Sequence, residues 1–155
     1  MARRSAGLLL HRSGENGTEV LLVHPGGPFW RGKQVAAWSV PKGEYADGDD
    51  PLEAAEREFA EELGRCAPPG VRRDLGDVRQ SSGKRVRVWA VAADFDPTGC
   101  TSNEAEVEWP PRSGRVVRFP EVDQAAWFPL EEARLRLVKA QVAFVDRLVA
   151  LVAAD

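Results

Sequence analysis

Cysteine is scarce in this sequence, because only Cys66 and Cys100 occur among 155 residues. They form no Cys-x-x-Cys motif and no histidine-rich segment accompanies them, so the sequence indicates neither a zinc site nor a disulfide framework. Such sparing use of cysteine fits a reducing compartment. We therefore expect a cytoplasmic protein.

An excess of positive charge is also missing. Lysine and arginine total 21 against 24 aspartates and glutamates, which gives a formal net charge of −3. A general nucleic-acid binder draws its affinity from basic residues that neutralise phosphates. We therefore expect no nucleic acid polymer among the partners, whereas an anionic small molecule can still bind at a local site.

Long hydrophobic runs are absent as well. The apolar run at residues 6–10 is shorter than the core of a signal peptide. The tail at 142–154 contains Asp146 and Arg147, which makes it a poor candidate to cross about 30 Å of hydrocarbon. We expect no contact with a membrane.

The composition that remains is ordinary for a globular protein, with 43% hydrophobic and 29% charged residues and no internal repeat. A chain of this length buries roughly 68–70% of its unfolded surface, so its core needs neither a metal nor a disulfide. The length predicts one domain, in which any bound metal would serve chemistry.

Alternating apolar and polar residues, bounded by turn residues, predict a sheet. The expected strands cover residues 5–10, 20–24, 35–40, 85–90, 104–109 and 116–119, the first two joined by a turn at 12–18. A helix at about 131–152 closes the chain. Strands interleaved with two helices predict an α/β sandwich.

The clearest local signal is a helix that begins after Asp50 and ends at Gly64. Asp50 can cap this helix, Pro51 suits its first position, Glu53 completes a D-x-x-E capping box, and Gly64 supplies the stop. An apolar stripe at three- and four-residue steps must face the core. It consists of Leu52, Ala55, Phe59 and Leu63.

Three carboxylates lie on another face of the same helix. Glu58, Glu61 and Glu62 are spaced i, i+3 and i+4, so they are neighbours that repel one another by roughly tenths of a kcal/mol per pair. A hard divalent cation would reverse this repulsion, and oxygen-only ligands select Mg²⁺ or Mn²⁺ over zinc. On the three glutamates alone, a solvated acidic face is the simpler interpretation.

The surrounding spacing favours the metal site. Gly43 is followed after five residues by Asp49 and, after seven more, by the run 57–64, Arg-Glu-Phe-Ala-Glu-Glu-Leu-Gly. This pattern closely resembles the Nudix box, G-x5-E-x7-R-E-U-x-E-E-x-G-U, where U is a bulky apolar residue. Two positions depart from it, since Asp49 replaces a Glu and Arg65 replaces an apolar residue.

The resemblance implies a Nudix-type α/β/α sandwich with a mixed β-sheet, formed as a single domain over residues 1–155. It also implies a divalent-metal-dependent hydrolase that acts on a nucleoside diphosphate linked to another moiety, with Mg²⁺ or Mn²⁺ as cofactor. The expected partner is a small nucleotide substrate.

Roles for the matching residues follow from the same resemblance. Glu58, Glu61 and Glu62 would bind the metal, and Arg57 would orient a carboxylate through its fork of donors. The general base would be Glu61 or a glutamate outside the box.

Four flanking residues complete the implied site. Lys42 could meet a phosphate, and Gly43 would permit a tight loop. Asp49 and Gly64 would be structural.

Residues outside the box must select the substrate. The lead-in at 38–43, Trp-Ser-Val-Pro-Lys-Gly, is similar to the W-x-x-P-K-G segment common in the diadenosine polyphosphate hydrolase branch of the Nudix family. Glu121 stands six residues before Trp127, as in the E-H-x-x-x-x-W segment of that branch, with Val122 in place of the His. The resemblance makes Glu121 an extra metal ligand or the base. A solvated loop carboxylate is the alternative.

Further substrate contacts are expected from aromatic and basic residues. Trp30, next to Phe29 in a loop rich in glycine and proline, could stack on a base, although aromatic residues more often pack in cores. Arg85 and Arg87 could bind a polyphosphate, although a basic strand face is more often only solvated.

The sequence as a whole favours hydrolysis of a diphosphate bond in a nucleoside polyphosphate, with diadenosine polyphosphate preferred. An NTP or a nucleotide sugar is the alternative substrate. A catalytically silent nucleotide-binding module is a different possibility, but a pure binder has no need of the mutually repelling Glu58, Glu61 and Glu62.

Overall fold

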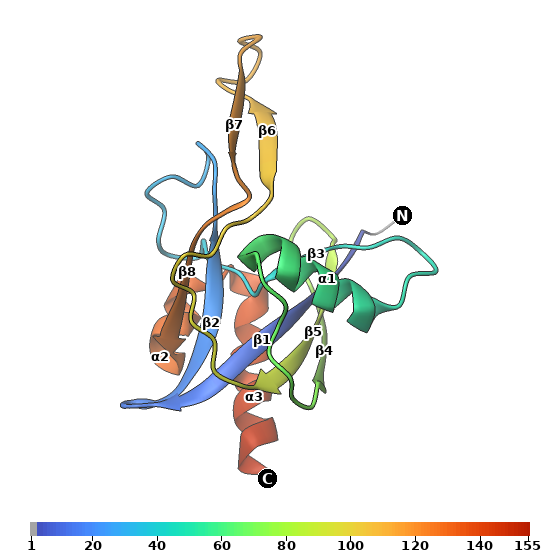
Figure 1. Ribbon diagram of the computed structural model, residues 1–155, viewed down its shortest axis with the longest axis vertical. Helices are drawn as coiled ribbons and strands as arrows, with labels where there is room; N and C mark the ends of the chain where they lie inside the picture. The colour runs from blue at the N-terminus through green and yellow to red at the C-terminus, as the bar shows by residue number, and fades with distance from the viewer. Residues whose placement is uncertain (1–2) are drawn as a thin grey trace.

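A central sheet runs through the molecule, with helices on both sides and a narrow hairpin projecting from one end (Figure 1). The computed structural model describes residues 3–155. The sheet contains β1 (Arg4–Gly14), β2 (Gly17–Pro25), β3 (Lys42–Glu44), β4 (Arg73–Arg79), β5 (Arg85–Ala92) and β8 (Val122–Pro129). The strand order is β4-β5-β1-β2-β8, with β3 paired to β1. The sheet is mixed, because β1 runs parallel to β5 and antiparallel to β2.

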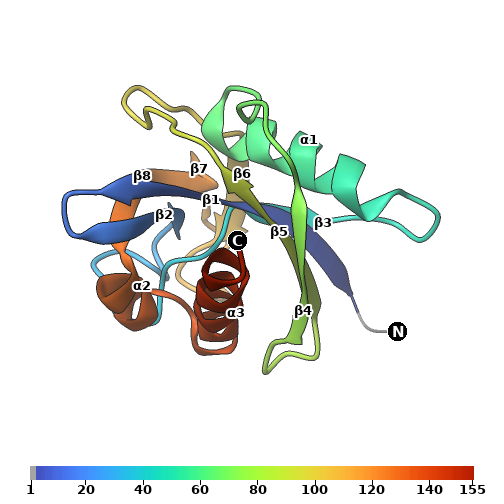
Figure 2. The ribbon, with the colours of Figure 1, turned by 90° about the horizontal axis from the view of Figure 1, so that it is seen from below.

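The helices form the outer layers. Figure 2 shows α1 (Pro51–Leu63) on one face of the sheet and α2 (Leu130–Arg136) and α3 (Val142–Ala153) on the other. Side chains of β1 alternate between the two cores, since Leu8 and Leu10 pack in the cluster beneath α1 and Leu9 packs in the cluster beneath α3. The predicted α/β/α sandwich with a mixed sheet is confirmed.

The predicted box helix is confirmed as α1. The Asp50 side chain accepts a hydrogen bond from the Glu53 N–H at 3.0 Å, and Gly64 ends the helix with a left-handed φ of 76°. Phe59 and Leu63 are fully buried against the sheet. The apolar stripe therefore fixes which face of α1 carries the glutamates.

The predicted strand at residues 35–40 is wrong. Ala36 has a left-handed φ of 53°, and Ala37 and Trp38 both donate their N–H groups to the Arg136 carbonyl at 2.8 Å. Isolated bridges at Trp38 and Ser39 stand in place of a ladder. The segment is therefore a loop tied to the end of α2.

The predicted closing helix at 131–152 is also wrong in its middle. The chain leaves α2 at Leu137, whose ψ is 144°, and the Val138 N–H donates to the Trp38 carbonyl at 2.9 Å. A short 3₁₀ turn, η1 (Lys139–Gln141), then leads into α3. The buried Gln141 accepts the Val40 N–H at 2.9 Å, so tertiary hydrogen bonds break the helix.

The predicted strands near 104–109 and 116–119 are confirmed as β6 (Glu104–Glu108) and β7 (Val116–Pro120). They form a separate two-stranded sheet, which is the projecting hairpin of Figure 1. The first hairpin is also confirmed, although β1 and β2 extend through most of the predicted turn at 12–18. None of the helices within residues 3–155 is long and apolar enough to cross a membrane.

Candidate active site

The box glutamates share one cavity, which lies between α1 and β3 and has a volume of about 380 Å³. The charged residues lining it come from α1, β3 and two distant loops: Glu58, Glu61, Glu62, Lys42, Glu44, Lys84 and Glu121. We call this space the carboxylate cavity. The fold thus brings residues 84 and 121 to the box helix, although they are remote from it in the sequence.

Glu62 is held against β3 in this cavity. Its Oε1 accepts a hydrogen bond from the Lys42 N–H at 3.0 Å. Burial raises the pKa of Glu62 to about 8 against the attraction of Lys42, and repulsion from Glu58 and Glu121 adds to the rise. Burial, together with the neighbouring Lys84, lowers the pKa of Lys42. A cation placed here would favour the ionised form of Glu62.

Glu58 occupies space that β3 leaves open at Gly43. A Cβ at position 43 would lie 2.0 Å from Oε2 of Glu58. The predicted reason for this glycine, a tight loop, is therefore wrong, because Gly43 lies in β3 without a left-handed φ. Burial and then Glu61 raise the pKa of Glu58. Arg57 Nη2 lies 3.6 Å from Glu58 Oε1, close enough to orient it.

The donor set of the carboxylate cavity fits a hard divalent cation. Glu58, Glu61, Glu62 and Glu121 offer oxygen ligands only, and Gly43 leaves room for a carboxylate. Within residues 3–155, no three acidic, histidine or cysteine side chains already converge as a finished metal-binding group. A bound cation would offset the repulsion among these carboxylates of like charge.

Glu121 reaches the cavity because backbone hydrogen bonds anchor its loop on two sides. Its N–H donates to the Asn103 carbonyl at 2.8 Å, and its carbonyl accepts the Gly26 N–H at 2.9 Å. The Asn103 N–H in turn donates to the Glu61 carbonyl at 3.2 Å. The residue thus stands beside the box helix, where an extra metal ligand or a base would stand.

The structural positions of the box lie outside the cavity. Asp49 Oδ2 accepts the Ala46 N–H at 3.2 Å and closes the turn before α1. Gly64 ends α1, and the Arg65 guanidinium next to it lies 4.5 Å from the centroid of the Phe95 ring. These residues shape the ends of the helix and the packing beside it.

The basic residues of β5 are mostly engaged elsewhere. Arg85 pairs with Asp77 at 3.1 Å and Arg87 pairs with Asp74 at 2.7 Å. Both arginines line a neighbouring polar cavity rather than the carboxylate cavity. Lys84, just before β5, is the member of this basic stretch that lines the carboxylate cavity itself.

A larger cavity of about 500 Å³ meets the carboxylate cavity at Glu62. Polar and aromatic side chains from the β2–β3 loop, β8 and α2 line it, including Gln34, Trp38, Asp123, Gln124, Phe128 and Arg136. Sequence reasoning missed these residues, apart from weighing Trp38, because they come from segments with no common spacing. The cavity offers hydrogen-bonding and stacking groups next to the carboxylates.

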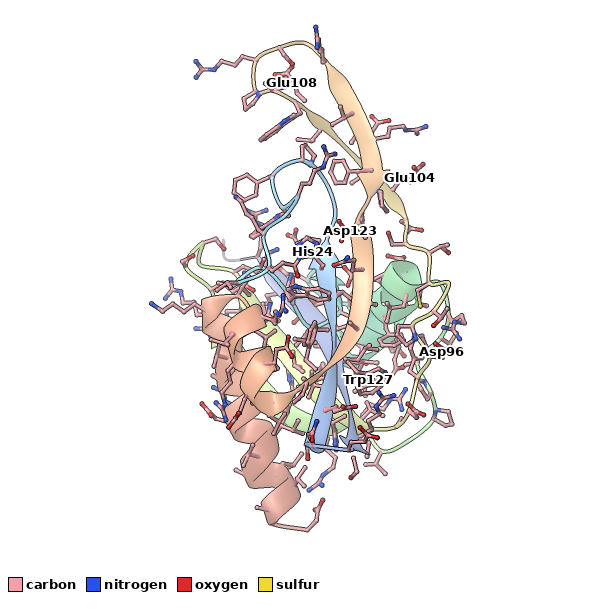
Figure 3. The ribbon with its side chains drawn as sticks, turned by 90° about the vertical axis from the view of Figure 1, so that its left-hand side faces the viewer. His24, Asp96, Glu104, Glu108, Asp123 and Trp127 are labelled. Atoms are coloured by element: carbon pink, nitrogen blue, oxygen red, sulfur yellow. The ribbon has the colours of Figure 1, made fainter. Side chains whose placement is uncertain are left out.

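His24 stabilises one wall of this larger cavity. Its buried ring lies between the Asp123 carboxylate, 2.7 Å from Nδ1, and the Lys33 carbonyl, 2.7 Å from Nε2. Figure 3 shows His24 and Asp123 pointing toward one another from β2 and β8. The pair ties the β2–β3 loop to the edge strand.

Trp30 does not line the carboxylate cavity. It lies instead beside an apolar pocket of about 340 Å³, formed by the loop at 25–30 and by the β6–β7 hairpin, from Phe119 near its base to Trp109 just beyond β6. Glu121 lines both spaces, so this pocket adjoins the carboxylate cavity.

Comparison with known proteins places the chain in a family. A family model described as NUDIX domain matches residues 1–148, which confirms the predicted resemblance. The RNA pyrophosphohydrolase of Rhizobium meliloti (strain 1021) is 29% identical over 138 residues, which cover 73% of this chain and 77% of that protein.

Solved structures show the same fold. A Caenorhabditis elegans Ap4A hydrolase in a binary complex matches with a TM-score of 0.67 and 20% identity, covering 99% of this chain and 100% of that one. The NUDIX domain of Shewanella oneidensis NrtR, complexed with ADP ribose, matches with a TM-score of 0.68 and 15% identity, covering 98% of this chain and 89% of that one.

Proposed function

Since the chain belongs to the NUDIX family and is a pyrophosphohydrolase of that family, we propose that it hydrolyses dinucleoside polyphosphates such as diadenosine tetraphosphate. The observation that carries the proposal is the position of Glu121 in the same cavity as Glu58, Glu61 and Glu62. Glu121 belongs to the segment that is similar to the diadenosine polyphosphate branch. The likeness in fold to an Ap4A hydrolase supports the same substrate class.

Nudix hydrolases generally need a divalent metal ion, and we propose Mg²⁺ or Mn²⁺ here because the ligands are carboxylate oxygens. Glu58, Glu61 and Glu62 would hold it, with Arg57 steadying Glu58. When bound, the ion lowers the pKa of a coordinated water and offsets the charge that develops on the phosphates.

The remaining side chains of the cavity supply substrate binding and proton transfer. Lys42 and Lys84 place two ammonium groups where phosphates would lie. Either Glu61 or Glu121 accepts the proton of the attacking water, since both carboxylates face the cavity. The larger cavity at Glu62 receives the nucleoside next to the cleaved bond, where Gln34 and Asp123 offer hydrogen-bond partners.

A specific observation favours a second candidate. The Rhizobium meliloti relative is named as an RNA pyrophosphohydrolase, and a triphosphorylated RNA end contains the same type of bond as a nucleoside polyphosphate. Removal of pyrophosphate from RNA 5′ ends is therefore the runner-up to dinucleoside polyphosphate hydrolysis. NTPs and nucleotide sugars are the other substrates to compare.

The test is a turnover screen of the purified chain with Mg²⁺ and with Mn²⁺. The panel contains diadenosine tetraphosphate, a 5′-triphosphorylated RNA, ATP, GTP and ADP-ribose. We expect the highest kcat/KM for diadenosine tetraphosphate. A higher value for the RNA would favour the runner-up, and binding of every nucleotide with turnover of none would make the chain a silent binding module.

A further inference from the structure

The apolar pocket beside Glu121 contains an unusual concentration of aromatic side chains. Phe29 and Trp30 enter it from the loop at 25–30, and Trp109 and Phe119 enter it from the β6–β7 hairpin. The Phe29 and Trp30 rings meet edge to face, with centroids 5.0 Å apart. Phe29 is 54% exposed, which is far more than a packing role requires. We call this space the aromatic pocket.

The backbone is shaped to let the hairpin close onto the loop. A Cβ at Gly26 would lie 1.9 Å from the Pro120 carbonyl oxygen, and a Cβ at Gly27 would lie 2.8 Å from the Phe119 ring. The Gly26 N–H also donates to the Glu121 carbonyl at 2.9 Å. The two walls of the aromatic pocket are therefore held at a fixed separation by close backbone contact.

The chemistry of the pocket selects a flat, uncharged group. In the part of the chain that the structure describes, Glu121 is the one charged side chain that lines it, and Val107 adds an apolar wall. The Lys33 ammonium does not line the pocket but lies 3.7 Å from the centroid of the Phe29 ring, where it is engaged with that ring. The remaining apolar and aromatic walls suit a nucleobase, which can stack on aromatic rings without any requirement for its sequence identity. A volume of about 340 Å³ is at the small end of ligand sites, as a single heterocycle requires.

The arrangement of the three cavities then defines the shape of the ligand. The larger cavity meets the carboxylate cavity at Glu62, and the aromatic pocket meets it at Glu121. A ligand that fills all three has phosphates in the middle and a nucleoside at each end. An NTP carries one base and leaves the aromatic pocket empty.

We propose that the aromatic pocket binds the second nucleobase of a dinucleoside polyphosphate, with Trp109 of the projecting hairpin as its stacking platform. This inference rests on the proposed function for its substrate class, but it assigns a site that the box and its carboxylates do not define. The hairpin is then a specificity element that distinguishes substrates with two nucleosides from those with one.

The experiment measures binding of ligands that cannot be cleaved, so it does not depend on turnover. Methylene-bridged analogues of diadenosine tetraphosphate and of ATP are titrated by calorimetry in Mg²⁺, together with a methylene-bridged triphosphate dinucleotide that models an RNA 5′ end. The variants are Trp109→Ala, Trp109→Phe and a matched control, Val116→Ala. Val116 lies on the same hairpin, is 62% exposed and does not line the pocket.

We expect Trp109→Ala to weaken binding of the diadenosine analogue by roughly 10- to 100-fold, the usual scale for losing one base-stacking contact. Binding of the ATP analogue should change less than about twofold, because that ligand does not reach the aromatic pocket. Trp109→Phe should restore most of the affinity, and Val116→Ala should leave it unchanged. Circular dichroism identifies any variant that fails to fold, in which case the comparison is carried by Trp109→Phe against Trp109→Leu.

Three outcomes would overturn the inference. Unchanged affinity of Trp109→Ala for the diadenosine analogue would remove the stacking site. An equal loss of affinity for the ATP analogue would show that the pocket binds the base of a ligand with only one nucleoside. A loss of affinity confined to the RNA model would show that the pocket binds the second base of an RNA 5′ end. A wild-type chain that binds the diadenosine analogue through Trp109 but hydrolyses nothing would support the pocket while refuting the proposed function.

Discussion

The box region and the hairpin region of this molecule are built in opposite ways. In the box region, Glu58, Glu61 and Glu62 lie within five consecutive residues of one capped helix, and Gly43 on the adjoining strand makes space for Glu58. In the hairpin region, Glu121 and Trp109 gain their positions from loops and strands that meet only in the folded chain. The proposed metal ligands are thus encoded locally, whereas the residues proposed to select the substrate depend on tertiary contacts.

The largest expected effect tests the box region as a whole. Removal of divalent ions with excess chelator should abolish turnover, because Glu58, Glu61, Glu62 and Glu121 then have no cation to bind. Readdition of Mg²⁺ or Mn²⁺ should restore the rate, whereas Zn²⁺ alone should not. Undiminished turnover in chelator would show that the box does not act through a metal.

The next prediction asks whether the hairpin region also supplies chemistry. If Glu121 is the base, Glu121→Gln should lower kcat by roughly 10²–10⁴-fold at saturating metal. Glu104→Gln is the matched control, since Glu104 is exposed on the adjoining hairpin and lies outside the cavity. A normal rate for Glu121→Gln would confine the chemistry to α1 and remove the main reason for preferring diadenosine polyphosphates.

A smaller effect is expected from Gly43→Ala. The added methyl group would collide with the Glu58 carboxylate, so the ligand must move by about 1 Å or more, a displacement that can cost on the order of 10²-fold in rate. Gly48→Asn is the control, because Gly48 lies in the same connection with no atom near its missing Cβ, and Asn tolerates its left-handed φ. Equal kcat values for the two variants would contradict the steric role of Gly43.

The smallest effect concerns the pH dependence of stability without metal. The pKa of Glu62 is near 8 in the folded chain against an ordinary value of 4.5, so the folded state binds more protons than the unfolded state between these values. The contribution of the protonated Glu62 carboxyl to the free energy of unfolding is fully present below pH 4.5 and is lost as the pH rises through 8. Between pH 5.5 and 8.5, Tm in chelator should therefore fall more for the parent than for Glu62→Gln. Parallel Tm profiles would show that burial does not penalise this carboxylate.

The sequence predicted the box region well because its signals are short-range. Asp50, Pro51 and Gly64 mark the ends of α1 by the hydrogen bonds and backbone angles that helix termini require. The apolar stripe through Phe59 then determines the exposed glutamate face. The error at Gly43 arose because the collision it avoids, with a side chain fifteen residues away, leaves no trace in the local pattern.

The strands and breaks that were missed depend on contacts far along the chain. β4 carries a single buried apolar residue, Leu75, and an irregular register between Asp74 and Asp77, so it shows no clean alternation. In β8, the buried Val122 is followed by exposed Asp123 and Gln124, because this is an edge strand whose polar residues face a cavity. The helix breaks at Leu137 because the next residue donates a hydrogen bond to the Trp38 carbonyl, about a hundred residues earlier in the chain.

The separateness of the β6–β7 hairpin has a consequence for how this protein can diverge. Among the residues that the structure describes, none between 104 and 120 belongs to either core cluster. Selection removes mutations that lower the stability of the folded protein below the threshold needed for function. Surface substitutions away from the core rarely lower stability that far. Substitutions at positions such as Val107 or Trp109 are therefore expected to have little effect on the stability of the fold. If the hairpin binds the second nucleobase as proposed, new substrate preferences can arise there while the sequence of α1 remains unchanged.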